Sequence, residues 1–330
     1  GIKFFNKDGQ KFSAELEKRI ESKLTQDMVA VDSINLGKAS RMSDAQGRYI
    51  EFCKSAFLDL DLSGLSILLD CANGATYSVA PKVFEELGAV VNTIGSSPDG
   101  ININQNCGST SPEFLKEEIT KGEHDIGIAF DGDGDRILIV TSDGDILDGD
   151  DILYILSQKL LKGSGIVGTL MTNKALEIYF EEKNINFLRA DVGDKYVLQQ
   201  LVEKNWLLGG EPSGHIICLD SAPTGDAIIA ALKFLNSIKE NNFSIDKTLD
   251  TFKKFPQTLI NLKVDNPNNI ILSDQFWSEV TNIETKLGDE GRVLIRPSGT
   301  EPLIRIMVES KDANISENLC NSLAELALKL

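Results

Sequence analysis

Short apolar runs alternate with stretches in which apolar residues recur every three or four positions, along most of the chain. Runs of the first kind predict strands, and stretches of the second kind predict helices packed on them. The order from residue 66 to residue 130 is strand, helix, strand, helix, strand, and a similar order resumes from residue 150 to residue 238. Predicted strands span 66–70, 89–94, 125–130, 137–141, 166–172 and 187–191, predicted helices span 75–87, 112–120, 150–161, 174–183, 195–203 and 226–238, and 207–219 is hairpin-like.

The two ends of the chain depart from this rhythm. The final part predicts helix 245–255, strand 259–264, helix 274–287, strands 292–296 and 303–309 and helix 316–330. At the other end, strand 2–5 and helix 13–24 are too small to enclose a core, and helix 43–57 leads into the first alternating unit. The predicted fold class is α/β, with consecutive related α/β mixed-sheet units followed by a small α+β C-terminal domain. The predicted boundaries give a remnant of an N-terminal domain at 1–43, α/β domains at 44–147 and 148–254, and the α+β domain at 255–330.

The composition argues against two classes of binding partner, nucleic acids and membranes. The 330 residues carry a formal net charge of -17, which would repel a nucleic-acid backbone, so no nucleic-acid partner is expected. Apolar runs stay well short of the roughly 20 residues that span a membrane, so no membrane partner is expected either. Five scattered cysteines without a CxxC pair favour a reducing cytoplasm over a disulfide framework or a zinc site.

The most informative segment is Asp131-Gly132-Asp133-Gly134-Asp135-Arg136, between two apolar runs. In an extended backbone, alternate side chains point to one side, so the three carboxylates are expected to meet at one point. Such a cluster of oxygen ligands favours a hard divalent cation, with Mg²⁺ the first choice. Arg136 adds a fixed positive charge beside that ion, which is an arrangement suited to phosphate.

The segment has three other possible interpretations. An acidic turn exposed to water is the plain alternative, because Asp and Gly dominate turns. An EF-hand is excluded by spacing, since Arg136 stands at the sixth position and Ser142 at the twelfth. An Asp-nucleophile phosphatase would fit the Asp131-Gly132-Asp133 start, but Gly134 argues against it.

Two further loops combine polar side chains between apolar strands. Gly210–His215 brings Glu211, Ser213 and His215 together, so it could grip sugar hydroxyls and pass protons, although a simple surface turn is the alternative. Arg296–Pro302 connects two strands, with Arg305 shortly after it, and its hydroxyls, backbone N–H groups and guanidinium groups would form an anion nest. Because open sheets bind ligands at the carboxyl ends of their strands, all three loops are expected to face one cleft.

At these three loops the chain resembles the α-D-phosphohexomutase family, in which loops reading DGDGDR, GExSGH and RPSGTEP occur in this order. The resemblance covers nearly the whole chain. The stretches 98–104, 107–110 and 255–261 most resemble the bacterial branch that acts on glucosamine phosphates. The resemblance implies a reversible transfer of phosphate between positions 6 and 1 of glucosamine, through a phosphoserine and a bisphosphorylated sugar, feeding UDP-N-acetylglucosamine and cell-wall synthesis.

Residue roles follow from the resemblance motif by motif. Asp131, Asp133 and Asp135 would hold one Mg²⁺ per active site, and a bisphosphorylated sugar would act as activator. Lys195, where the family usually has arginine, would contact a small-molecule phosphosugar. The remaining roles are catalysis by Lys3, His215 and Arg136, sugar binding by Glu211 and Ser213, and phosphate binding by Arg296, Ser298, Gly299, Thr300 and Arg305.

The serine loop of the family would lie upstream of Gly1, so these 330 residues alone are not expected to complete the reaction. A non-catalytic sugar-phosphate binder is therefore an open alternative, as is activity of the phosphomannomutase or phosphoglucomutase type. The sequence leaves the oligomeric state open, with a homodimer as one option.

Overall fold

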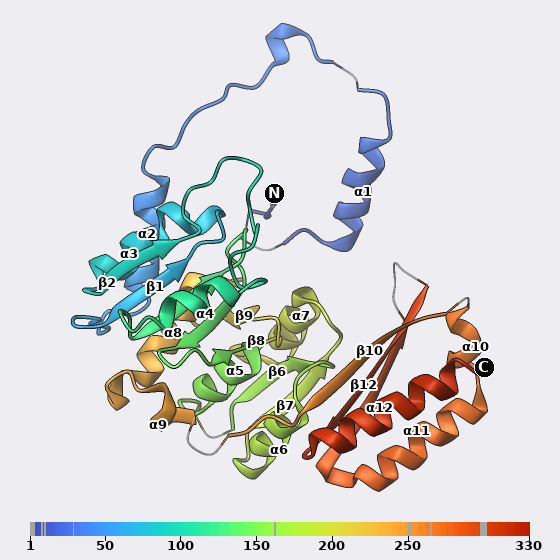
Figure 1. The fold of residues 1–330 in the computed structure, drawn as a ribbon. Helices are drawn as coiled ribbons and strands as arrows, with labels where there is room; N and C mark the ends of the chain where they lie inside the picture. Colours follow the sequence, from blue (N-terminus) through green and yellow to red (C-terminus); the bar gives the residue numbers. More distant parts are fainter. Residues whose placement is uncertain are drawn as a thin grey trace. The chain divides into compact units, whose positions relative to one another are not determined.

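The computed structural model describes residues 4–7, 9, 11–28, 30–161, 163–249, 252–264, 266–297 and 302–330. The chain divides into two compact units (Figure 1). The first unit comprises Gly1–Ile152, Leu207–Gly209 and Ser213–Ile245, and the second comprises Leu153–Trp206, Gly210–Pro212 and Asp246–Leu330. Among the described residues, no helix is both long and apolar enough to cross a bilayer.

A five-stranded mixed sheet organises the first unit. Its strands are β1 (Ser66–Asp70), β2 (Val90–Ile94), β3 (Ile126–Phe130), β4 (Ile137–Thr141) and β5 (Ile146–Leu147), in the order β2-β1-β3-β4-β5. The first three are parallel, and β4 runs antiparallel to both β3 and β5. The carboxyl ends of β1 and β3 therefore meet at one edge of the sheet, which is where the acidic loop begins.

Several helices of the first unit cover this sheet with apolar faces, whereas the helix Ala14–Leu24 is exposed along nearly all of its described length. The helices are α1 (Ala14–Leu24), α2 (Ala45–Ser55), α3 (Ala80–Glu86), α4 (Glu113–Ile119) and α8 (Ala227–Ile238), with 3₁₀ turns at Ser33–Asn35, Ala75–Ser78 and Lys239–Asn241. Leu115 and Ile119 of α4 pack on Leu68 and Val140. Helix α8 is apolar on nearly every side and almost wholly buried, as expected of a helix in a core.

A second sheet follows the order β7-β6-β8-β9. Its strands are β6 (Gly165–Thr169), β7 (Asn186–Ala190), β8 (Leu208–Gly210) and β9 (Ile216–Cys218), and β6 and β7 are parallel. The nearby helices are α5 (Gly149–Ser157), α6 (Lys174–Glu182), α7 (Asp194–Lys204) and α9 (Ile245–Leu249).

The C-terminal part of the second unit is a three-stranded antiparallel sheet with helices α11 and α12 packed on it (Figure 1). Its elements are β10 (Gln257–Lys263), α10 (Pro267–Ile271), α11 (Asp274–Leu287), a 3₁₀ turn Gly288–Glu290, β11 (Gly291–Pro297), β12 (Leu303–Ser310) and α12 (Ala313–Ala327). Phe276, Val280, Ile283 and Leu287 recur at helical spacing along α11 and enter the core beside β12. The predicted mixed-sheet α/β units and small α+β domain are confirmed.

A buried ion pair joins this C-terminal sheet to the loop that follows β6. Glu309 is fully buried and pairs with Arg292, whose Nη2 donates to the second carboxylate oxygen at 3.1 Å. The same guanidinium donates to the carbonyl oxygens of Leu170 at 2.7 Å and Thr172 at 2.8 Å, and Glu309 also accepts from the backbone N–H of Lys174 at 3.1 Å. The C-terminal sheet is thus connected to the end of β6 and the loop after it through one desolvated pair.

Several predicted element boundaries needed correction. The predicted helix 245–255 was wrong at residues 252–255, which are not helical; there the side chain of Asn173 accepts from the N–H of Phe255 at 3.0 Å and donates to its carbonyl at 2.9 Å. The predicted helix 75–87 divides into a 3₁₀ turn and α3, since Pro81 lacks an N–H and suits only the first turn of a helix. Helix α12 begins three residues earlier than predicted because Asp312 caps it.

Candidate active site

The tip of the β3–β4 hairpin carries the acidic loop. Asp131 is buried, and its Oδ1 accepts hydrogen bonds from the backbone N–H groups of Asp135 at 3.0 Å and Arg136 at 3.1 Å. These bonds curl the loop into a turn, and Gly134 adopts φ +74° within it. The predicted convergence of the carboxylates therefore comes from a turn that the Asp131 side chain caps, whereas the expected extended alternation was wrong.

The three aspartates of this loop form one acidic cluster. One carboxylate oxygen from each of Asp131, Asp133 and Asp135 lies within 4.8 Å of the others. Burial, reinforced by the charges of Asp135 and Asp133, raises the pKa of Asp131 to about 6. Carboxylates this crowded repel one another unless a proton or a cation lies between them, and oxygen ligands suit hard cations. The cluster therefore fits a divalent metal ion.

Two basic side chains accompany the acidic cluster in the first unit. Arg136 Nε lies 3.9 Å from Asp131 Oδ2, and its side chain is about half exposed. His215 is buried, and its Nδ1 lies 3.4 Å from Asp135 Oδ2. The structure thus brings together five of the predicted residues, which the sequence had placed in two separate motifs.

Close backbone contacts hold His215 in this place. The N–H of Ile137 donates to the carbonyl of Gly214 at 3.0 Å, and a Cβ on Gly214 would lie 2.0 Å from the carbonyl oxygen of Ile137. A Cβ on Gly225 would lie 2.1 Å from Nε2 of His215. A side chain at position 214 would therefore displace the backbone of Ile137, and a side chain at position 225 would displace the imidazole.

Sequence reasoning missed two residues that line the cavity beside the cluster, Tyr49 and Asp226. This cavity has a volume of about 580 Å³, and Thr76, Asp133 and Asp135 also line it. The Tyr49 hydroxyl donates to Asp226 Oδ2 at 2.8 Å, and Asp226 caps α8 through the N–H groups of the first turn. Burial raises the pKa of both Asp226 and Tyr49. The sequence signal that could have identified Asp226 is the triplet Thr224-Gly225-Asp226 directly before an apolar helix.

The second unit carries Glu211 and Lys195 of the predicted sugar-binding residues, and Arg296 and Arg305 of the predicted phosphate-binding residues. Glu211 Oε1 accepts from the N–H of Gly193 at 2.9 Å, just before α7, where Lys195 is exposed and lies 4.8 Å from the ring centre of Tyr196. Arg296 and Arg305 are register partners on β11 and β12.

The remaining predicted site residues belong neither to the acidic cluster with its two basic neighbours nor to the second-unit residues described above. Ser213, which belongs to the first unit, is exposed. Lys3, Ser298, Gly299 and Thr300 lie outside the described residues.

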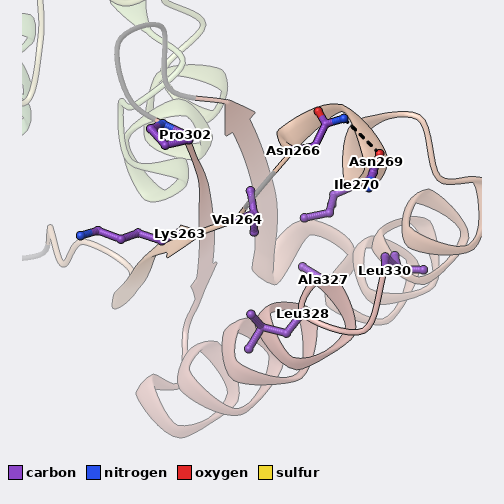
Figure 2. A pocket seen from close by; sticks show the side chains of 9 residues that line it. All are labelled: Lys263, Val264, Asn266, Asn269, Ile270, Pro302, Ala327, Leu328 and Leu330. Atoms are coloured by element: carbon purple, nitrogen blue, oxygen red, sulfur yellow. Dashed lines mark hydrogen bonds between the residues drawn. The ribbon is translucent and has the colours of Figure 1, made fainter.

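A different hollow lies in the C-terminal domain, with a volume of about 420 Å³ (Figure 2). Lys263 and Ile270 line it, and Asn266 donates to Asn269 at 3.3 Å (Figure 2). Because its lining contains no carboxylate side chain and none of the predicted site residues, it does not compete with the acidic cluster as a metal site.

Comparison with known proteins gives consistent matches. Three domain models described as phosphoglucomutase/phosphomannomutase match the chain: alpha/beta/alpha domain II at residues 47–144, alpha/beta/alpha domain III at 148–255 and the C-terminal domain at 259–326. The phosphoglucosamine mutase of Aliivibrio fischeri is 48% identical over 330 residues, covering 98% of this chain and 74% of that protein. That of Legionella pneumophila is 48% identical over 339 residues, covering 100% of this chain and 74% of that protein.

A solved structure supports the same fold. The N-acetylphosphoglucosamine mutase of Aspergillus fumigatus, in complex with GlcNAc-6P and magnesium, matches with a TM-score of 0.70 at 19% identity. The match covers 86% of this chain and 70% of that chain.

Proposed function

Because this chain belongs to the phosphoglucomutase/phosphomannomutase family, as its three loop motifs predicted, we propose that it interconverts glucosamine 6-phosphate and glucosamine 1-phosphate. The observation that carries the proposal is the cluster of Asp131, Asp133 and Asp135 beside Arg136 and His215. Phosphoryl transfer needs concentrated positive charge at the transferred group and a group that moves a proton at the sugar hydroxyl. The cluster and its two neighbours supply both.

The acidic cluster would hold one Mg²⁺ ion. When bound, Mg²⁺ supplies fixed positive charge for phosphate oxygens. Arg136 would orient those oxygens with its half-exposed guanidinium, which is always charged. His215, fixed by Gly214 and Gly225, would accept the proton of the attacking hydroxyl and return it to the leaving oxygen.

Glu211, Ser213 and Lys195 would bind the sugar and its substituents. The carboxylate of Glu211 already accepts one backbone N–H, which fixes the side chain and leaves acceptor capacity for hydroxyls. Lys3, by its place in the family motif, would be a second proton-transfer residue.

The phosphate that does not react would bind at the β11–β12 hairpin. Like charges directly opposite each other across two strands destabilise a sheet, so the register pair Arg296 and Arg305 is best explained by an anion that they share. Ser298, Gly299 and Thr300, which follow β11 in the sequence, would add hydroxyl and N–H donors.

The proposed reaction changes the position of the phosphate on the sugar and leaves the serine phosphorylated at the end. A phosphoserine donates its phosphoryl group to the free hydroxyl of the substrate, which forms a bisphosphorylated sugar. The sugar then returns its other phosphate to the serine. A trace of bisphosphorylated sugar would keep the serine phosphorylated and so act as activator. A cytoplasmic location is proposed as well, since all five cysteines are buried free thiols.

The experiment uses the full-length protein, including the family's serine loop. With glucosamine 6-phosphate as substrate, and with Mg²⁺ and a trace of glucosamine 1,6-bisphosphate present, the protein should form glucosamine 1-phosphate. Product formation is monitored by ³¹P NMR. Mannose and glucose phosphates, assayed in parallel, should react more slowly. Absence of product from any of these sugars, with a phosphorylated serine verified by mass spectrometry, would refute the proposal and leave a non-catalytic phosphosugar binder.

A further inference from the structure

A buried carboxylate that none of the three loop motifs contains lies next to the metal loop. Asp70 is the last residue of β1 and has no exposed surface. Burial in this apolar sheet raises the pKa of its carboxyl. A carboxylate is costly in such surroundings unless hydrogen bonds compensate it, so its position calls for a structural or functional reason.

The two oxygens of Asp70 tie two separate loops together. Oδ1 accepts from the N–H of Ala72 at 2.9 Å, and Oδ2 accepts from the N–H of Gly108 at 2.6 Å. The first loop turns through the left-handed region twice in succession, at Ala72 with φ +54° and Asn73 with φ +48°. A residue with a side chain, such as alanine, rarely adopts this conformation, and backbone strain of this kind concentrates at functional sites.

Both loops then bond to the backbone on either side of Asp131. The N–H of Ala75 donates to the carbonyl of Gly132 at 2.8 Å, and the N–H of Ser109 donates to the carbonyl of Phe130 at 2.8 Å. The residues before and after the buried aspartate of the cluster are therefore each held by one of the loops that Asp70 connects.

The contacts between these loops and the metal loop are too close for side chains. A Cβ on Gly74 would lie 2.3 Å from the carbonyl oxygen of Gly132. A Cβ on Gly108 would lie 2.6 Å from the carbonyl oxygen of Phe130. Backbone packed this closely transmits a displacement of one loop to the next.

We propose that Asp70 is a positioning residue for the metal-binding loop: by bonding the loops 71–75 and 107–109, it fixes the backbone around Asp131 and so sets the affinity of the acidic cluster for a divalent cation. Asp70 touches neither metal nor substrate in this role. The inference rests on the part of the proposed function that assigns a divalent cation to the cluster, and it requires nothing of the sugar chemistry.

The direct test is Asp70→Asn, measured as Mn²⁺ affinity of the 330-residue chain by electron paramagnetic resonance without phosphosugar. The amide has the shape of the carboxylate, but its NH₂ group must face one of the two N–H donors, so one loop loses its bond. Mn²⁺ affinity should fall at least tenfold, while the far-UV circular dichroism spectrum remains that of the wild type. The matched control is Asp125→Asn, since Asp125 Oδ2 accepts from the N–H of Ser66 at 2.8 Å at the opposite edge of the same sheet. Its Mn²⁺ affinity should stay within twofold of wild type.

A measurement on the unmodified chain covers the case in which Asp70→Asn does not fold. Coupling between sites is reciprocal, so if Asp70 positions the metal loop, bound metal must stabilise the two bonds that Asp70 accepts. Hydrogen exchange at the N–H groups of Ala72 and Gly108 should slow when Mg²⁺ is added, whereas exchange at the N–H of Ser66 should not change.

The outcomes separate this inference from the proposed function. If the wild-type chain binds Mn²⁺ and Asp70→Asn binds it with equal affinity, the positioning role alone is overturned. The same holds if hydrogen exchange at the N–H groups of Ala72 and Gly108 is unchanged when Mg²⁺ is bound. If the wild-type chain binds neither ion, the metal assignment in the proposed function fails, and the positioning role fails with it.

Discussion

Replacing Arg292 by methionine should be among the most damaging single changes in the second unit. The substitution keeps most of the side-chain volume but removes both bonds to the buried carboxylate of Glu309 and the bonds to the carbonyls of Leu170 and Thr172. Glu309 keeps hydrogen bonds from Lys174 N–H and the Gln257 side chain, so its charge remains buried with partial compensation. Breaking a buried pair from one side costs about 3–5 kcal/mol. Because Arg292 is slightly exposed and Arg189 still donates to the carbonyl of Thr172, about 4 kcal/mol is the expected loss.

The assay is urea unfolding at 25 °C followed by tryptophan fluorescence. Trp206 and Trp277, the two tryptophans of the chain, both belong to the second unit and therefore report on it. The double variant Arg292→Met with Glu309→Met should recover about 2 kcal/mol or more of the loss, since an apolar pair can replace a buried ion pair with little net change.

The control for this prediction is Lys311→Met, which removes an exposed pair with Glu290 and should cost at most about 1 kcal/mol. A loss below about 1 kcal/mol for Arg292→Met, with an unchanged dependence on urea, would show that the pair does not hold the C-terminal sheet to the loop after β6.

Three further predictions follow from the site, from acid titration and from the thiols. Gly225→Ala should lower kcat of the full-length protein about tenfold or more, because its Cβ would displace His215. The control Gly37→Ala, with no atom near its added Cβ, should leave kcat unchanged. Equal kcat values for the two variants would contradict the proposed role of His215. Burial opposes the ionisation of Glu177, but Arg189 more than offsets it and lowers the pKa, so the stabilisation is present above about pH 4.3 and is lost as pH falls through the lower folded value. Glu177→Gln should therefore lose less stability than wild type between pH 7 and acid, measured by urea midpoints, and parallel losses would refute this. In the native protein, thiol reagents at pH 8 should label few cysteines within minutes, whereas all five should react in urea. The reason is that burial raises the pKa of every thiol, to about 12 for Cys53, Cys71 and Cys218 and to about 11 for Cys320, and it raises that of Cys107 as well. Rapid labelling of the native protein would contradict this prediction.

Much of the fold could be predicted because its signals are local. Strand 66–70 and helix 274–287 were predicted at their observed bounds, since an unbroken apolar run and a helical spacing of apolar residues identify them without help from the rest of the chain. The non-helical backbone at Phe255 could not be predicted. Its N–H and carbonyl bond to the side chain of Asn173 across 82 residues of sequence, and no local pattern contains that contact.

The site was predictable in composition but less so in construction. The acidic cluster was identified because three aspartates stand within five residues, yet the curl of the loop depends on bonds from Asp131 to backbone N–H groups that spacing does not reveal. The contact between His215 and Asp135 likewise needs the Gly214–Ile137 backbone bond between distant segments. Asp70 was missed altogether, because a single aspartate at the end of a strand looks like any other.

The absence of free space between Gly225 and His215 has a practical consequence for engineering this protein toward other sugars. In a saturation library at position 225, every residue other than glycine carries a Cβ that would collide with the imidazole of His215. Diversity is better directed at Ser213, which is exposed, and at Pro212, which is half-buried beside it. Changes there alter the loop that is proposed to bind the sugar without moving the imidazole of His215.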